Sequence, residues 1–282
     1  MREQNFLSKR PLLYLLATPI GNLEDASPRF LKVLNEVDLV ACEDTRVTGK
    51  LLSFFKIKKP LISLREHNEV SESEVVVKQI LEGKKVAYVS DAGYPCISDP
   101  GARLVEIALR NGVNVTCVPG ANAALVALVA SGLDSSRFYF HGFLSAKDKE
   151  RLEELAELSD KKETLIFYEA PHRIKKTLVD MLDAFGARRA CIARELTKLH
   201  EEYIRGTLNE LVEIDESTLK GEMVIIVEGR HEEMSAMIGD DEIIKMVNFY
   251  QESGLSTKDA IKKVSERTSI NKNYIYKIYH LN

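Results

Sequence analysis

The sequence predicts an α/β protein in which two α/β domains are followed by a small helical domain. Short apolar runs typical of strands alternate with amphipathic stretches typical of helices over most of the 282 residues. Loops rich in glycine, proline, asparagine and aspartate follow several of these runs. From about residue 240 onward the strand-like runs stop, and only helical spacing remains. We therefore expect domains at residues 1–125, 126–232 and 240–282.

The first domain is predicted to contain a largely parallel sheet, because each of five strand-like runs is followed by a helical stretch. Ser27 and Pro28 mark the start of the first helix, since serine is a favoured N-cap and proline is favoured at the first helical position. Further helices are expected near 46–55 and at 69–82. The strands are "PLLYLLAT" (11–18), "VDLVACED" (37–44), "PLISL" (60–64), "KKVAYVSD" (84–91) and "VNVTCVPG" (113–120).

The second domain is predicted to be mixed α/β. A charged helix is expected at 148–159 and another helix is expected to open at Pro171. Short links join the last strands, which favours antiparallel pairing there. The strands are "RFYFHGF" (137–143), "ETLIFYEA" (163–170), "ARRACIARE" (187–195), "HEEYIRGT" (200–207) and "GEMVIIVEG" (221–229).

The third domain is predicted to consist of three short helices after a linker, "RHEEMSAMIGDD" (230–241). Gly254 suits the position after a helix end, and Ser256 with Asp259 resembles a capping box. The helical stretches are "EIIKMVNFYQESG", "STKDAIKKVSERTSI" and "NKNYIYKIYHL".

The charge of the chain is unevenly distributed. The formal net charge is −4, yet residues 258–282 carry six Lys or Arg against two Asp or Glu. A basic tail on an acidic body is common in enzymes that act on polyanions, and a solvated helix surface is the alternative. The tail also has tyrosines among its lysines, which suit base stacking beside phosphates or else fill its core. These residues are Tyr274, Tyr276, Tyr279, Lys272 and Lys277.

The four cysteines lie far apart without a C-x-x-C pair, which argues against a zinc site. Cys42, Cys117 and Cys191 lie in apolar strand-like runs, so we expect buried thiols in a reducing compartment. The N-terminus shows no signal-peptide pattern, and no run of eighteen apolar residues occurs. We therefore expect a cytoplasmic protein.

Four predicted strands end in loops rich in Gly, Pro, Asn and Asp. Ligands of open parallel sheets bind at the carboxyl ends of the strands, so several such loops indicate a shared cleft. The loops are "TPIGNLED" (18–25), "SDAGYPCISDPG" (90–101), "PGANAA" (119–124) and "APHRI" (170–174).

The chemistry of these loops narrows the ligand. Neither G-x-x-x-x-G-K-[ST] nor G-x-G-x-x-G occurs, which disfavours Walker-type nucleotide binding and a Rossmann dinucleotide site. The loop at 90–101 offers carboxylates and carbonyls, which suit ribose hydroxyls and a cationic group better than pyrophosphate. S-adenosylmethionine has a ribose, an amino group and a sulfonium but no phosphate, so it fits this pattern. The alternative is that Asp91 and Asp99 only hold the turn together.

Seven motifs occur in order along the two α/β domains: "ATPIGNLED", "CEDTR", "SDAGYPCISDPG", "VPGANAA", "FYEAPHRI", "RELTKLHEE" and "GEMVIIVEG". Together they resemble the tetrapyrrole-methylase superfamily, and within it the ribosomal RNA small subunit methyltransferase I family. The resemblance implies a class III methyltransferase fold, with S-adenosylmethionine in a cleft between the two α/β domains, and a homodimer. It also implies 2′-O-methylation of a cytidine in the decoding centre of 16S rRNA, number 1402 in the usual rRNA numbering. The implied partner is 16S rRNA within the small ribosomal subunit.

The resemblance also implies which residues bind the cofactor. Ser90, Tyr94 and Asn122 depart from the glycine, threonine and serine that are usual at those positions. Glu195 is expected in the wall that the second domain contributes. The implied cofactor-binding residues are Pro19, Gly21, Ser90, Asp91, Ala92, Gly93, Asn122, Ala123, Tyr168, Glu169, Gly221 and Glu222.

Methyl transfer to a ribose hydroxyl needs alignment, and a general base or a charge that stabilises the developing alkoxide assists it. We expect Glu195 to act as base or positioning carboxylate, with Arg46 and Lys198 meeting phosphate or alkoxide charge. Salt bridges at the rim of the cleft are the alternative role for each. His67 and His172 are weaker candidates, since each could equally be a structural turn residue. The chemistry requires no metal.

Two other functions stay open at this point. Methylation of a tetrapyrrole would leave the basic tail without a role. An RNA-binding assembly factor that has lost catalysis would not need the intact loops at 90–101 and 119–124, which argues against that alternative.

Overall fold

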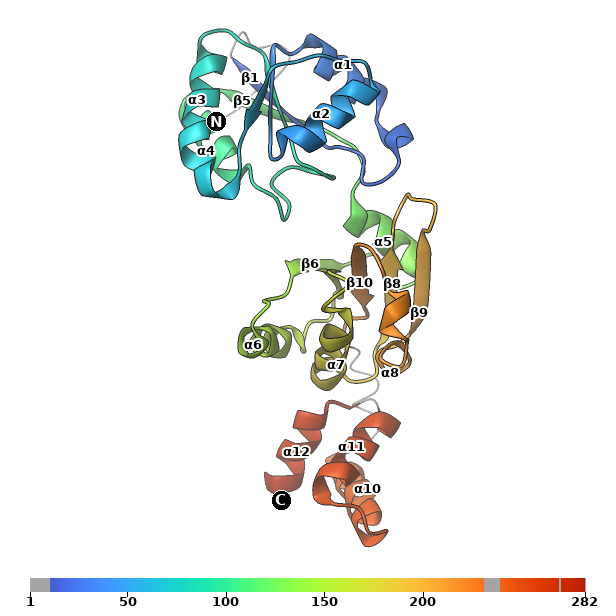
Figure 1. Ribbon diagram of the computed structural model, residues 1–282. Coiled ribbons are helices and arrows are strands. Elements are labelled where there is room, and N and C mark those ends of the chain that lie inside the picture. The colour runs from blue at the N-terminus through green and yellow to red at the C-terminus, as the bar shows by residue number, and fades with distance from the viewer. Residues whose placement is uncertain (1–10, 231–238, 269, 282) are drawn as a thin grey trace. The chain divides into compact units, whose positions relative to one another are not determined.

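The computed structural model describes residues 11–230, 239–268 and 270–281 (Figure 1). Contacts divide the chain into two compact units, Met1–Ala123 and Ala124–Asn282. Within the described residues, each unit contains a five-stranded sheet. The limits of independently folding domains, set above at residues 125, 232 and 240, stay predictions.

The sheet of the first unit is parallel throughout, which confirms the prediction. Its strands are β1 (Leu12–Leu16), β2 (Leu39–Cys42), β3 (Leu61–Ser63), β4 (Val86–Val89) and β5 (Asn114–Val118), in the order β3-β2-β4-β1-β5. Figure 1 shows α1 and α2 on one side of this sheet and α3 and α4 on the other. The helices are α1 (Pro28–Glu36), α2 (Thr45–Phe54), α3 (Glu69–Leu81) and α4 (Ala102–Arg110), with short 3₁₀ turns at Leu23–Asp25 and Glu66–Asn68.

Apolar clusters cover both faces of this sheet. On one face Leu13 packs with Leu104 of α4, and on the other Leu16 packs with Phe30 of α1. Every residue of the central strand β4 is buried. A strand buried on both faces gives a continuous apolar run in the sequence rather than an alternating one, which is why this strand is easy to predict.

The first helix begins as expected. The Ser27 hydroxyl accepts a hydrogen bond from the Phe30 N–H at 3.1 Å, and Pro28 occupies the first helical position. This bond satisfies one of the N–H groups that a helix start leaves without a partner.

The second unit is α/β as predicted, and the antiparallel pairing expected for its last strands is confirmed. Its strands are β6 (Phe138–Phe143), β7 (Thr164–Glu169), β8 (Arg189–Arg194), β9 (Glu202–Thr207) and β10 (Met223–Val227), in the order β6-β7-β10-β8-β9. The β6–β7 pair is parallel and the other three pairs are antiparallel. The helices are α5 (Ala123–Ser131), α6 (Asp148–Leu158), α7 (Ile174–Phe185) and α8 (Leu208–Leu211), with a 3₁₀ turn at Glu216–Thr218.

The prediction that Pro171 opens a helix is wrong. The Arg173 N–H donates to the Ala170 carbonyl at 3.1 Å, which closes a four-residue turn with Pro171 at its second position. Proline suits that position of a turn as well as it suits a helix start, so the sequence signal is ambiguous. Helix α7 begins three residues later, at Ile174.

The C-terminal segment forms three helices, as predicted. These are α10 (Asp240–Glu252), α11 (Thr257–Thr268) and α12 (Lys272–Leu281), which share an apolar cluster. Gly254 follows the end of α10 with a φ of +93°, which confirms its helix-terminating position. The Ser256 hydroxyl accepts from the Asp259 N–H at 3.2 Å and also contacts the Asp259 carboxylate, so one half of the expected capping box is present. Most of the predicted linker lies outside the described residues.

Two of the three cysteines expected to be buried are buried. Cys42 and Cys191 lie inside the two sheets, whereas Cys117 is exposed. The prediction for Cys117 is wrong because β5 is an edge strand, so an apolar run there is covered less completely than in the middle of the sheet. No helix in the described part of the chain is long and apolar enough to cross a membrane.

Gly101 gives a test of the packing in the first unit. Its φ is +124°, and a Cβ at this position would lie 2.4 Å from the ring of the fully buried Tyr88. We expect Gly101→Ala to destabilise the protein by about 3 kcal/mol, since overpacking adds to the backbone strain. Urea unfolding measures this difference.

Gly112→Ala is the matched control, because Gly112 also has a positive φ, +73°, but no atom lies within 4 Å of an added Cβ. This variant should lower the free energy of unfolding only by the cost of a left-handed backbone at a residue with a Cβ, about 1 kcal/mol. Equal losses of stability in the two variants would contradict the close contact between Gly101 and Tyr88.

Candidate functional site

Three of the predicted loops gather at one edge of the first sheet. β4, β1 and β5 are neighbours and run parallel, so their carboxyl ends lie together. The loops at 18–25, 90–101 and 119–124 begin at these ends. The structure therefore brings together the residues of the first unit that were expected to bind a ligand.

A two-way backbone bridge joins the first two loops. The Thr18 N–H donates to the Gly93 carbonyl at 2.8 Å, and the Gly93 N–H donates to the Thr18 carbonyl at 3.1 Å. Gly93 has a φ of +79°, and a Cβ there would meet the Ile20 side chain at 3.5 Å. The buried Ser90 hydroxyl donates to the same Gly93 carbonyl at 3.1 Å, so it stabilises the loop from inside.

The third loop is held against the other two. A Cβ on Gly120 would lie 2.9 Å from the Ala17 carbonyl oxygen, so the backbone of this loop presses directly on the end of β1. The Tyr94 hydroxyl accepts a hydrogen bond from the Gly120 N–H at 3.1 Å. In the sequence, Tyr94 stands out only as a departure from the usual threonine. Nothing in the residue spacing indicates its hydrogen bond to Gly120.

Acidic side chains meet at the same edge, at the ends of β2 and β4. The Asp91 Oδ1 accepts a hydrogen bond from the Asp44 N–H at 3.2 Å, and Glu43 lies next to Asp44 at the end of β2. Partial burial raises the pKa of Asp91, and the charge of Asp44 adds to the rise. Burial likewise raises the pKa of Glu43, with added contributions from Asp91 and Asp44.

Arg46 balances part of this negative charge. Its guanidinium donates to the Asp44 carboxylate at 2.6 Å, and the Arg46 N–H donates to Asp44 Oδ1 at 2.8 Å as the cap of α2. These bonds hold the pKa of Asp44 well below its usual range. The Arg46 side chain is nevertheless 81% exposed, so it can also meet another anion.

A second group of predicted residues gathers at one edge of the second sheet. Met223 at the start of β10 pairs with Glu169 at the end of β7 and with Arg194 at the end of β8. Because β10 runs antiparallel to both, its first residues and their last residues share this edge. The register therefore brings Glu169, Glu195 and Glu222 to the same end of the sheet, and a shared role in cofactor binding stays a prediction.

Glu195 is the most constrained residue of this group. Its φ is +51°, a left-handed conformation that is rare outside glycine, and Thr197 follows with +65°. A Cβ on Gly221 would lie 2.1 Å from the Glu195 carboxylate, so the glycine leaves space for it. Lys198 Nζ donates to Glu195 Oε1 at 2.9 Å. The fold thus holds a carboxylate and an ammonium side by side at the sheet edge.

The side chain of Glu169 is buried, although this residue was expected to bind the cofactor. Its side chain is only 1% exposed, and its oxygens accept from the Thr177 hydroxyl at 2.5 Å and the Ala170 N–H at 2.7 Å. The Arg173 Nε lies 3.4 Å away, and this arginine also donates to the Leu144 carbonyl. The Glu169 carboxylate therefore organises the turn before α7, and the residue as a whole is only 2% exposed.

The remaining candidates are distributed over both units. Tyr168 is half-buried and packs edge-to-face against Phe140 and Phe143, with ring centroids 5.1 and 5.5 Å apart. His67 lies in the first unit and His172 in the second, and both are exposed. Pro19, Asn122 and Ala123 are half-buried, whereas Gly21, Ala92 and Glu222 are exposed. Among the residues that the structure describes, no group of three His, Cys, Asp or Glu could hold a metal ion.

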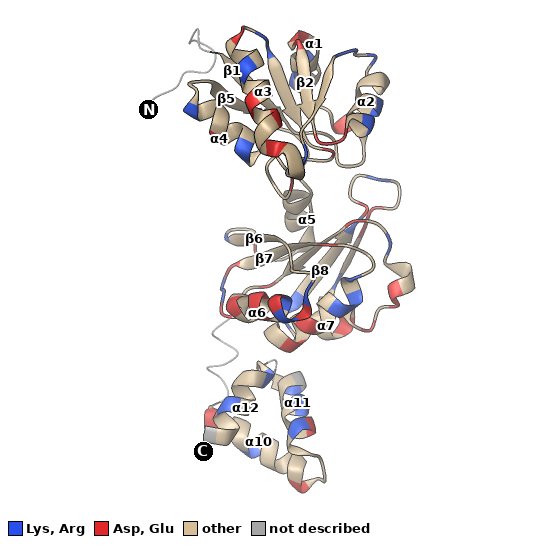
Figure 2. Cartoon of the chain, turned by 60° about the vertical axis from the view of Figure 1, so that its left-hand side comes forward, with Lys and Arg blue, Asp and Glu red and all other residues tan. Residues whose placement is uncertain are grey.

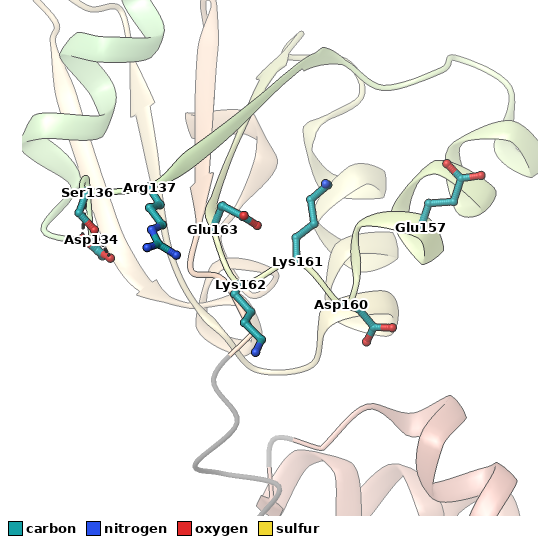
Figure 3. Close-up of a pocket in the computed structure, with 8 residues that line it drawn as sticks. All are labelled: Asp134, Ser136, Arg137, Glu157, Asp160, Lys161, Lys162 and Glu163. Carbon is teal, nitrogen blue, oxygen red and sulfur yellow. Dashed lines mark hydrogen bonds between the residues drawn. The ribbon is translucent and has the colours of Figure 1, made fainter.

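A separate pocket of 720 Å³ lies at the other edge of the second sheet, where β6 and β7 begin (Figure 3). Ser136 there donates to the carboxylate of Asp134, which closes a local turn. Charged side chains of both signs line the pocket, and none of its described lining residues is aromatic, so these residues offer no ring for stacking with a nucleoside base. Its lining residues are Asp134, Ser136, Arg137, Glu157, Asp160, Lys161, Lys162 and Glu163.

Comparisons with known proteins agree with this arrangement. A family model described as Tetrapyrrole (Corrin/Porphyrin) Methylases matches residues 12–212. A protein of Halalkalibacterium halodurans named Ribosomal RNA small subunit methyltransferase I is 47% identical, over 95% of this chain and 94% of that one. The Bacillus subtilis protein of the same name is 42% identical, over 99% of this chain and 98% of that one. The chain belongs to the ribosomal RNA small subunit methyltransferase I family.

Solved structures more distant from this family share its fold. Uroporphyrin-III-C-methyltransferase from Thermus thermophilus matches with a TM-score of 0.56 at 19% identity, covering 78% of this chain and 94% of that one. Diphthine synthase matches with a TM-score of 0.59 at 15% identity, covering 77% and 89%. At these identities the likeness shows the tetrapyrrole-methylase fold alone.

Asp91 gives a test of the acidic cluster. Its pKa in the folded state is raised, so the native protein binds this proton more tightly than the unfolded chain does. Stability therefore falls as the pH rises from the unfolded pKa, about 3.9, through the raised folded value. Asp91→Asn keeps an acceptor for the Asp44 N–H without the charge. We expect it to be more stable than the wild type at pH 7, as measured by urea unfolding.

The gain should shrink as the pH is lowered toward 4, where the wild-type carboxyl becomes protonated. Asp25→Asn, an exposed carboxylate of the same unit, should change stability little at either pH. A variant that loses stability at pH 7 would show that the Asp91 charge is stabilising instead.

Proposed function

We propose that the protein transfers a methyl group from S-adenosylmethionine to the 2′-hydroxyl of the decoding-centre cytidine of 16S rRNA, and that it acts on the small ribosomal subunit. The observation that carries this proposal is the 47% identity over nearly the full length to a relative named Ribosomal RNA small subunit methyltransferase I. The match to the Bacillus subtilis relative of the same name covers 99% of this chain, so it extends over the C-terminal helices as well. The proposed substrate places the enzyme in the cytoplasm.

The loops of the first unit suit this cofactor chemically. The segments Thr18–Gly21, Ser90–Gly93 and Pro119–Asn122 contain no Lys or Arg, which a phosphate would call for. They present backbone groups, the Asp91 carboxylate and the Asn122 amide, which suit ribose hydroxyls, an amino group and a sulfonium. The cofactor supplies the electrophilic methyl carbon. The proposed contacts from the second unit are Tyr168, Gly221 and Glu222, and the buried Glu169 is proposed to hold the turn that follows Tyr168.

Glu195 is the proposed proton acceptor or positioning carboxylate for the attacking hydroxyl. Its left-handed backbone and its contact with Gly221 restrict the carboxylate to one place, which supports alignment. Lys198, bound to it at 2.9 Å, is proposed to stabilise the negative charge that develops on the ribose oxygen. Arg46 is proposed to meet a phosphate of the RNA by leaving its partner Asp44.

The C-terminal helices are proposed to contact RNA, and the structure narrows the candidate side chains. The Tyr274 hydroxyl donates to Asp240 at 2.9 Å, and the Tyr279 hydroxyl donates to Asn248 at 2.8 Å, so both tyrosines stabilise the helical segment. Tyr276 is 57% exposed beside His280, with ring centroids 4.2 Å apart. Tyr276 is therefore the proposed stacking residue of this segment.

The protein is also proposed to form a homodimer. In α5 the side chains of Leu125 and Val129 are 46% and 75% exposed, while Ala127 and Leu128 are buried. The helix thus has an apolar side inside the unit and an apolar side outside it. Sedimentation at micromolar concentration tests this proposal, and a monomer would contradict it.

Methylation of a tetrapyrrole is the second candidate function, because the matching family model carries that description. Labelled S-adenosylmethionine separates the two. We expect label in 16S rRNA of unmethylated small subunits, in a dinucleotide that resists alkaline hydrolysis because its 2′-oxygen is blocked. Label in a precorrin mixture, or in rRNA at an alkali-labile position, would contradict the proposal.

Glu195→Gln tests the proposed chemistry. The amide keeps the shape of the side chain but cannot accept the proton, so single-turnover transfer should slow by about 10²–10⁴-fold. Cofactor affinity, measured by calorimetry, should change little. Glu213→Gln, an exposed residue of the same unit, is the control. An unchanged single-turnover rate in Glu195→Gln would remove this residue from the mechanism.

A further inference from the structure

Helix α2 and the loop after it carry an unusual charge for this protein. Residues 45–60 contain five Lys or Arg and no Asp or Glu, in a chain whose net charge is −4. Figure 2 shows the blue Lys and Arg positions along the ribbon of α2. Lys59 has a structural role, because its Nζ donates hydrogen bonds to the Asn35 and Val37 carbonyls at 2.8 and 2.6 Å. The other four are Arg46, Lys50, Lys56 and Lys58, and all are exposed.

Three of the exposed side chains of α2 share one face of the helix. Arg46, Lys50 and Phe54 are spaced four residues apart, which places them above one another. The Phe54 ring is 59% exposed although it is large and apolar. From Arg46 to Phe54 the face extends about 12 Å along the helix axis. It combines cations with an accessible aromatic ring.

The residue after α2 has a backbone conformation that lysine does not favour. Lys56 has a φ of +57°. The Ile57 N–H donates to the Leu52 carbonyl at 2.9 Å and the Lys56 N–H donates to the Ser53 carbonyl at 3.0 Å, which is the Schellman arrangement of a helix end. The left-handed residue of this arrangement is usually glycine.

Other helices of the protein follow that rule. The corresponding residues after α3, α4 and α10 are Gly83, Gly112 and Gly254, all with positive φ. The chain therefore places a lysine where glycine would be less strained. An exposed cation at a strained position calls for a reason other than stability.

The position of α2 in the fold indicates what the exposed Lys56 could bind. Its cap Asp44 donates its N–H to Asp91 of the acidic loop, so α2 begins at the edge where the strand-end loops lie. The opposite side of α2 packs in the core, since Leu52 is 4% exposed and lies in one apolar cluster with Phe30. A helix that lies on a membrane needs its apolar face free, so an anionic lipid surface fits this helix poorly.

We propose that Arg46, Lys50, Phe54, Lys56 and Lys58, the α2 face, bind the RNA segment that flanks the methylated nucleotide. The cations contact phosphates, and Phe54 stacks on an unpaired base. This inference rests on the proposed function and adds to it a substrate-binding surface that extends away from the strand-end loops.

Lys56→Gly is the most discriminating variant, because glycine relieves the strained backbone while it removes the charge. We expect its melting temperature to be equal to or above that of the wild type. Its KM for unmethylated small subunits should rise at least threefold, with kcat and S-adenosylmethionine affinity unchanged. The slope of log affinity against log salt should become shallower by about 0.7–0.9, one phosphate contact.

Phe54 tests the stacking contact separately. Phe54→Tyr keeps the aromatic face and should resemble the wild type, whereas Phe54→Leu should raise KM for the subunits. Lys32→Ala is the control for charge, because Lys32 is 73% exposed on α1 and pairs with Glu36. It should leave KM unchanged. Equal KM values for Phe54→Tyr and Phe54→Leu would overturn the stacking contact.

Different experimental results would contradict the α2 inference and the proposed function. A wild-type protein that transfers no methyl group to small subunits refutes the proposed function, and the α2 inference with it. A wild type that does so, with Lys56→Gly and Lys50→Ala indistinguishable from it across a range of salt, overturns the α2 face alone. Sedimentation with vesicles of phosphatidylglycerol and phosphatidylcholine that depends on Lys50 would assign the face to membranes and overturn its assignment to RNA.

Discussion

The arrangement of the first unit depends on the close approach of three backbone segments at one sheet edge. Thr18 and Gly93 exchange two hydrogen bonds, and Gly120 lies against the carbonyl of Ala17 with no room for a side chain. The Tyr94 hydroxyl then joins the second loop to the third. Because each contact involves backbone atoms, the loops cannot separate without losing hydrogen bonds that water would have to replace. The rigid edge that results is what allows polar groups to be held in fixed positions for a ligand.

Backbone strain is found at the segments to which we assign binding or chemistry. Among the described residues, non-glycine residues with positive φ are Lys56, Cys96, Ser98, Glu195 and Thr197. Cys96 and Ser98 belong to the acidic loop, Glu195 and Thr197 to the loop after β8, and Lys56 to the end of α2. Each such conformation costs on the order of 1–3 kcal/mol and persists only where the surrounding structure enforces it. The buried strands contribute the stability that this strain reduces.

The strands, the parallel sheet of the first unit, the antiparallel pairing of the last strands and most helix starts could be predicted from the sequence, because buried strands and capping residues leave local signals. The parallel pairing of β6 with β7 had no such signal. The prediction at Pro171 was wrong because proline favours a turn as much as a helix start. The prediction that Cys117 is buried was wrong because an edge strand has the same apolar composition as an inner one. The candidate site could be predicted as a set of loops through family resemblance. The bond from Gly120 to Tyr94 and the inward-facing carboxylate of Glu169 could not, since they depend on contacts between distant segments.

The central claim is that the packed strand-end loops bind S-adenosylmethionine, and calorimetry of Gly120→Ala tests it most directly. An added methyl group would lie 2.9 Å from the Ala17 carbonyl, so it should displace the third loop while the sheet stays folded. Gly49→Ala is the matched control, because an added Cβ there meets nothing within 4 Å. We predict that the wild type and Gly49→Ala bind the cofactor equally and that folded Gly120→Ala binds it at least about tenfold more weakly, a difference of about 1.4 kcal/mol. Equal binding by all three proteins, or no binding by the folded wild type, would contradict the account.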